Sequence, residues 1–255
     1  MSIKVRRSLI WGGVVSFAAA FAGSHPAHAG VVDLRRIVPI QGDAAAGAQK
    51  SAVCAACHGA DGAPTAPLFP RLSGQRPDYL YHRLVAFHSA DPKSPYYSTS
   101  AMTPLAAQLS DRDMRDLAVY FASQSPKAAP AQISSPDSAA TVASPAAPSS
   151  ATPEATRGQQ IFLAGNSSRG IPPCQGCHGP DANGSRIRSG QYAVYPALRG
   201  QSGPFVVSRL KSFRDGLPAD TSSALIMGGV AHNLDDDSIE SLAAWLSSLT
   251  PERSF

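Results

Sequence analysis

Two short strings of the form C-x-x-C-H constrain this chain more than any other feature. Residues three apart on a helix are neighbours, so the two thiols of such a string share one face, and the histidine follows directly after them. Both thiols can form thioethers with the vinyl groups of one haem while the imidazole binds the iron from the same side. The strings predict two haem c groups, bound by Cys54, Cys57 and His58 and by Cys174, Cys177 and His178.

The two strings belong to an internal repeat. Residues 70–75, with the sequence P-R-L-S-G-Q, recur as residues 196–201, with the sequence P-A-L-R-G-Q. Farther along, an R-L-x-x-F pattern that begins at Arg83 recurs at Arg209 with the same spacing. Self-similarity of this kind indicates a duplicated structural unit, so the two halves are copies of one module.

A stretch of biased composition separates the two copies. Residues 125–156 are almost entirely Pro, Ala, Ser and Thr, with no aromatic residue and no apolar periodicity. Such a stretch buries too little surface to offset the entropy of ordering it, and it is typical of a flexible linker. We therefore expect one domain at residues 30–124, a linker at 125–153 and a second domain at 154–255.

The first 29 residues are typical of an export signal. Three basic residues precede an apolar run at residues 9–22, and residues 27–29 have the small-x-small pattern of a cleavage site. A retained membrane anchor is the alternative, but it needs about 20 apolar residues. This run is shorter and is interrupted by two glycines and a serine. We therefore expect export and cleavage after Ala29.

The charge of the mature protein excludes one class of partner. Removing the signal takes away three positive charges and no negative one, so the net charge falls from +4 to +1. Bound haems would add carboxylates to this nearly neutral chain. Nucleic-acid binding therefore has no support in the sequence.

Apolar spacing predicts helices and no strands. Ser110 and Asp113 form a capping pattern in front of a stripe with the spacing i, i+3, i+4 and i+7. The stripe consists of Met114, Leu117, Ala118 and Phe121, and in the second module of Ile239, Leu242, Ala243 and Leu246. Helices are also expected to begin at Asp43 and at Thr152-Pro153, where proline costs no helical hydrogen bond. The predicted fold is all-α.

Three other uses of the cysteines are weaker. A disulfide within each pair leaves the histidine that follows both pairs unexplained. A zinc site needs four ligands at matched spacings, and the linker separates the two pairs. A thioredoxin-like redox pair needs a βαβ setting, which the sequence lacks.

Each iron needs a sixth ligand or else keeps an open site. Met102 and Met227 occupy equivalent places in the repeat, seven residues before the leucine that precedes the last helix. Met114 aligns instead with Ile239 on the apolar stripe and is expected to pack in the core. Three histidines have no counterpart in the other module that binds metal, namely His82, His88 and His232. We therefore predict His/Met coordination of both irons.

Two six-coordinate irons leave no position for a substrate. Such a protein transfers electrons and is not expected to be an enzyme. A thioether is a soft ligand that favours ferrous iron, so it raises the reduction potential relative to two histidines.

The motifs resemble the class I cytochrome c fold, and the two-module chain is similar to the cytochrome c4 family of periplasmic dihaem carriers. The resemblance is carried by the C-x-x-C-H strings, the P-x-L-x-G-Q segments and residues 102–111. It implies two tandem domains, each wrapped around one haem, with the helix near Gly47 or Gly158 packed on the C-terminal helix. It also implies that Pro70 and Pro196 orient the proximal histidines.

The chain departs from that family in its connection between modules. Typical members have a short connection and pack so that haem propionates meet, whereas a linker at 125–153 is expected here. Whether the modules pack together or move independently stays open at this point. Residues 166–173 and 183–192 are extra in the second module and are expected to form surface loops.

The resemblance implies a carrier between redox partner proteins, a respiratory donor and a terminal oxidase or reductase, with membrane association only through those partners. One alternative is an electron-transfer subunit of a periplasmic dehydrogenase complex. Another is a dihaem redox enzyme such as a peroxidase, which needs an open or unusually ligated iron. The chain has four cysteines, all used by the two strings, which speaks against thiolate ligation.

Overall fold

The computed structural model describes residues 38–126 and 152–254, apart from positions 92, 188, 219 and 220. The predicted export signal at 1–29 and all but the ends of the predicted linker at 125–153 lie outside the described residues. The described elements are helices, apart from one isolated β-bridge between Asn166 and Ile171. The all-α prediction is therefore confirmed. Among these residues no helix is both long enough and apolar enough to cross a membrane.

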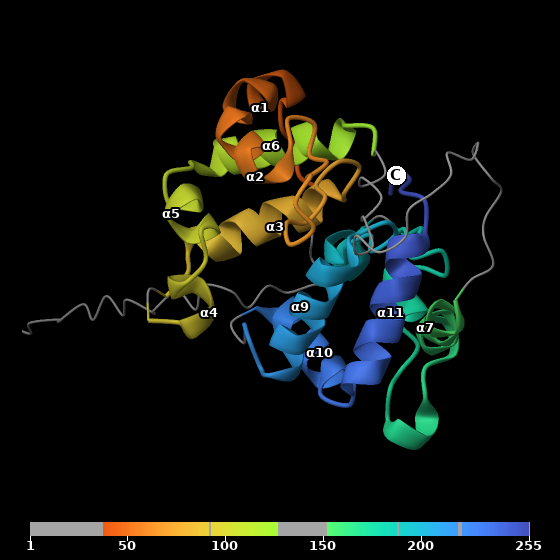
Figure 1. Cartoon of the computed structure of the whole chain (residues 1–255). Coiled ribbons are helices and arrows are strands. Elements are labelled where there is room, and N and C mark those ends of the chain that lie inside the picture. The colour runs from red at the N-terminus through yellow and green to blue at the C-terminus, as the bar shows by residue number, and fades with distance from the viewer. Residues whose placement is uncertain (1–37, 92, 127–151, 188, 219–220, 255) are drawn as a thin grey trace, which may run out of the picture.

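The helices form two modules, coloured orange to yellow-green and green to blue in Figure 1. The first module contains α1 (Ala44–Lys50), α2 (Ala52–His58), α3 (Pro77–His88), α4 (Pro95–Ser98), α5 (Met102–Ala106) and α6 (Asp111–Ser123). The second contains α7 (Pro153–Ala164), η2 (Ser167–Arg169), α8 (Gln175–His178), η3 (Gly190–Val194), α9 (Gly203–Arg214), α10 (Ser222–Ala231) and α11 (Asp236–Ser248).

The predicted helix starts are confirmed by their capping contacts. The Asp43 side chain accepts hydrogen bonds from the first turn of α1, and Thr152 Oγ1 accepts one from the Ala155 N–H at the start of α7. Ser110 and Asp113 form a reciprocal capping box at the start of α6. Each cap satisfies backbone donors that have no partner within the helix.

The first and last helices of each module touch at a glycine. A Cβ atom built at Gly47 in α1 would lie 2.2 Å from the Asp116 carbonyl oxygen of α6. At Gly158 in α7 the corresponding distance to the Ser241 carbonyl oxygen of α11 is 1.9 Å. No side chain fits at either crossing, so the helix packing that the resemblance implied is present in both modules.

Replacing Gly158 with alanine is expected to lower the free energy of unfolding by about 1–3 kcal/mol, because the new methyl group forces α7 away from α11. Denaturant unfolding of the haem-loaded protein measures this change. Gly229 on α10 is the control, since nothing lies within 4 Å of a Cβ atom there. Gly229→Ala is expected to leave stability unchanged or slightly raised. Equal stability of the two variants would show that the crossing tolerates a side chain.

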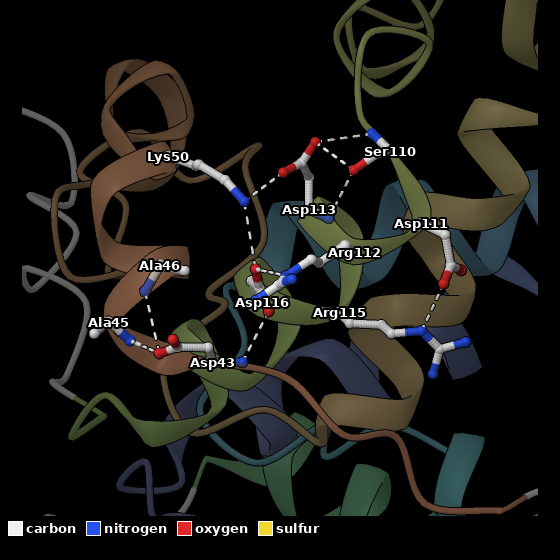
Figure 2. A network of polar contacts seen from close by, with 10 residues as sticks. All are labelled: Asp43, Ala45, Ala46, Lys50, Ser110, Asp111, Arg112, Asp113, Arg115 and Asp116. Atoms are coloured by element: carbon white, nitrogen blue, oxygen red, sulfur yellow. Dashed lines mark hydrogen bonds and ion pairs between the residues drawn. The ribbon is translucent and has the colours of Figure 1, made fainter.

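A polar network surrounds the crossing in the first module (Figure 2). Asp116 is 2% exposed, and its carboxylate accepts hydrogen bonds from the Asp43 N–H at 2.8 Å and from Lys50 Nζ at 3.3 Å. The Lys50 ammonium also pairs with Asp113. The hydrogen bond from the Asp43 N–H is the main reason that the pKa of Asp116 lies below its usual value, and Lys50 makes a smaller contribution in the same direction. The second module has Ser241 at the equivalent place, so the network distinguishes the two copies.

The two modules also contact each other. Arg76 of the first module donates to the carbonyl oxygens of Ser185 at 2.8 Å and Ile187 at 3.2 Å. The Ser254 hydroxyl, near the end of the chain, donates to the Gly74 carbonyl oxygen at 2.8 Å. The extra residues 183–192, expected to form a surface loop, therefore include part of the contact between modules, although the Ile187 side chain is exposed.

Candidate haem sites

The six residues predicted to attach haem form two groups of three. Cys54, Cys57 and His58 lie on α2, and Cys177 and His178 lie on α8 with Cys174 at its N-cap. All four cysteines are free thiols and are partly exposed. A disulfide within either pair is therefore absent, and every thiol is available for a thioether bond.

The histidines of both C-x-x-C-H strings have a fixed ring orientation. His58 Nδ1 lies 3.0 Å from the Pro70 carbonyl oxygen, and His178 Nδ1 lies 2.9 Å from that of Pro196. A carbonyl oxygen only accepts hydrogen bonds, so the proton belongs on Nδ1 and the Nε2 lone pair is left for a metal. The two prolines therefore occupy the role that the resemblance implied.

The surroundings of these rings favour the form that binds iron. Both imidazoles are 6% exposed, and burial lowers the pKa of each below its usual value. The neutral imidazole is the ligand form of histidine. Aromatic rings lie beside both: Phe69 is 6.0 Å from His58 and Tyr195 is 6.4 Å from His178, between ring centroids. The sequence analysis did not identify these two aromatic residues, although each directly precedes the proline whose carbonyl group binds the histidine.

The predicted sixth ligands lie later in each module. Met102 is the first residue of α5, and Met227 lies within α10; both are partly buried. Met114 is 3% exposed and lies on the core face of α6. Ligation by Met102 and Met227 stays a prediction.

The rival histidines have other environments. His88 Nδ1 lies 2.9 Å from the Ala106 carbonyl oxygen, and the ring of His82 contacts that of Tyr81, with centroids 5.2 Å apart. His232 is exposed at the C-terminal end of α10. Among the described residues, no three side chains of His, Cys, Asp and Glu are arranged so that they could bind a metal ion by themselves.

The surroundings of a buried arginine indicate whether this part of the molecule suits a haem. Arg71 is 5% exposed, and burial lowers its pKa to about 10. Its terminal nitrogens donate to the carbonyl oxygens of Ser73 at 2.7 Å and Arg199 at 2.6 Å, but Nε has no partner. No carboxylate of the described residues forms an ion pair with Arg71. Burying a cation without a counter-charge is unfavourable, so the site suits an anion such as a haem propionate.

Comparison with known proteins gives consistent matches over both modules. The sequence profile of the cytochrome c family matches residues 44–125 and 155–250. Cytochrome c4 of Stutzerimonas stutzeri is 34% identical over 212 residues, which are 82% of this chain and 90% of that protein. The thiosulfate dehydrogenase electron acceptor of Thiomonas intermedia is 32% identical over 213 residues, 82% of this chain and 85% of that protein.

A solved structure shares the architecture. The crystal structure of reduced cytochrome c4 from Pseudomonas stutzeri superposes with a TM-score of 0.63 and 34% sequence identity. The match covers 82% of this chain and 100% of that one. The likeness therefore extends over two tandem modules and not over one alone.

Proposed function

Because this chain belongs to the cytochrome c family and is a cytochrome c4-like dihaem protein, we propose that its two C-x-x-C-H strings attach the two haems. Cytochrome c4 relatives are electron-transfer proteins and not enzymes, and the chain shares that function. The observation that carries the residue assignment is the pair of buried histidines, each with Nδ1 bound to a proline carbonyl. Cys54 and Cys57 form the thioethers of the first haem, and Cys174 and Cys177 those of the second.

When bound, each haem supplies an iron that gains or loses one electron. The work of the chain is to bind, orient and tune it. His58 and His178 present Nε2 as neutral ligands, and the carbonyl groups of Pro70 and Pro196 keep each ring in place. Burial around both histidines excludes water from the proximal side. The guanidinium of Arg71 supplies a positive charge that would stabilise a haem propionate.

We further propose that Met102 and Met227 close the distal sides. Both are partly buried and equivalent in the repeat, whereas the three rival histidines lack equivalents that bind metal. Two methionine ligands would leave neither iron with a position for a substrate, so the bound haems would supply electron transfer and no reaction at the metal.

The partners are redox proteins, and we propose a respiratory donor together with a terminal oxidase or reductase as acceptor. One relative is named an electron acceptor of thiosulfate dehydrogenase. A periplasmic dehydrogenase is therefore the second candidate donor, with this chain as its acceptor or electron-transfer subunit. Copurification with a dehydrogenase would distinguish a bound subunit from a free carrier.

The proposal is tested on protein exported to the periplasm, where we place this chain with its signal cleaved after Ala29. Intact mass is expected to equal the chain from Gly30 plus two haems, and a redox titration is expected to take up two electrons per chain. A colourless protein, or a mass without added haem, would overturn the assignment.

A further inference from the structure

Two buried glutamines join the modules in a crossed arrangement. Gln75 of the first module donates from Nε2 to the Ala197 carbonyl oxygen at 2.9 Å, and its Oε1 accepts from the Ala197 N–H at 2.8 Å. Gln201 of the second module donates from Nε2 to the Arg71 carbonyl oxygen at 2.9 Å, and its Oε1 accepts from the Arg71 N–H at 3.0 Å. Both glutamines are 3% exposed. We name these four residues the amide clasp.

The clasp follows the symmetry of the repeat. Gln75 is equivalent to Gln201, and Arg71 is equivalent to Ala197. Each glutamine therefore binds the same backbone position in the other module. An amide with both its donor and its acceptor engaged by one residue has a single orientation, and a buried amide that loses these partners is strongly disfavoured.

Each clasped residue lies next to a haem site. Arg71 directly follows Pro70, whose carbonyl oxygen accepts from His58 Nδ1, and Ala197 directly follows Pro196, whose carbonyl oxygen accepts from His178 Nδ1. A side chain of the second module thus fixes the peptide that borders the first histidine, and the converse holds for the other pair.

We propose that Gln75 and Gln201 are positioning residues for the haem site of the opposite module. The clasp limits the motion of the proline carbonyl that binds each proximal histidine. The strength of that hydrogen bond controls the electron donation of the imidazole to iron. Contact between the modules therefore tunes both sites, even though the chain between them passes through residues 127–151. This inference rests on the proposed ligation by His58 and His178.

Gln201→Ala is the cleaner test, because the hydrogen bonds of the Gln201 side chain go to Arg71, whereas Gln75 Oε1 also accepts from the Arg76 N–H at 2.9 Å. The readout is solvent exchange of the histidine Nδ1–H protons, followed by nitrogen-15 NMR in the fully reduced, haem-loaded full-length protein. Exchange at His58 is expected to accelerate about tenfold while exchange at His178 stays unchanged. The reduction potential of the first haem is expected to shift more than that of the second.

Three further variants test whether the effect passes from one module to the other. Gln75→Ala is expected to accelerate exchange at His178, in the other module. Gln108→Ala is the control, since this exposed side chain donates to the Pro104 carbonyl oxygen within its own module, and it is expected to change neither histidine. Gln201→Asn keeps the amide donor and acceptor on a side chain that is one methylene shorter, so it is also expected to accelerate exchange at His58, and it replaces Gln201→Ala if that variant does not fold.

The outcomes separate the clasp from the ligation on which it depends. Equal acceleration at both histidines, acceleration confined to the module that carries the substitution, or no change at either would overturn the clasp as a positioning device. Wild-type protein that carries haem but whose His58 and His178 nitrogen-15 signals do not respond to reduction of the iron would instead count against the proposed ligation.

Discussion

Replacing Cys174 and Cys177 together with serine is expected to leave the protein with one covalently bound haem instead of two. A serine hydroxyl does not form the thioether that links the chain to a haem vinyl group, so the second module loses its attachment. The intact mass of the exported variant is expected to fall by one haem, and its visible absorbance by about half. The first module keeps Cys54 and Cys57 on α2 and is expected to stay loaded.

The mirror variant is the matched control for this result. Replacing Cys54 and Cys57 with serine is expected to remove the first haem and to leave the second. The two single-haem proteins then give each module's spectrum and potential separately. Retention of two covalent haems by either double variant would show that the C-x-x-C-H strings are not the attachment sites.

The parts of the fold that depend on local chemistry were predictable. Caps at Asp43, Ser110 and Thr152 require only nearby residues, and each is present as predicted. The C-x-x-C-H strings are local patterns as well, and the cysteines and the histidine of each string lie within about one turn of helix. The proline carbonyls that bind the histidines came only from the family resemblance, since residues far apart in the sequence form those contacts.

The contact between modules could not be predicted. The composition of residues 125–153 predicts a flexible linker but does not indicate whether the modules on either side of it pack together. The contact depends on pairs such as Arg71 and Gln201, which are distant in the sequence and carry no local pattern. One sequence feature could have indicated the contact: both P-x-L-x-G-Q segments end in glutamine, which has an amide side chain that can donate and accept hydrogen bonds. Both glutamines are buried.

The two modules differ at the methionines that we propose as distal ligands. Met102 begins α5, a helix of five residues, whereas Met227 lies inside α10, a helix of ten. A ligand within a longer helix has a backbone held by more hydrogen bonds than one at the first position of a short helix. We therefore expect the two iron–sulfur bonds to differ in strength, and the two haems to differ in potential.

Replacing Met102 or Met227 with alanine is expected to remove about half of the weak absorption band near the red end of the oxidised spectrum, and the double variant to remove all of it. This band arises from charge transfer between a methionine sulfur and iron. Each single variant is also expected to lower the potential of its own haem, because a thioether stabilises ferrous iron. Met114→Leu is the control, since Met114 is buried in the core and leucine conserves its apolar volume. If both alanine variants keep the whole band, other groups bind the irons, and the case for two closed, purely electron-transferring sites loses its basis.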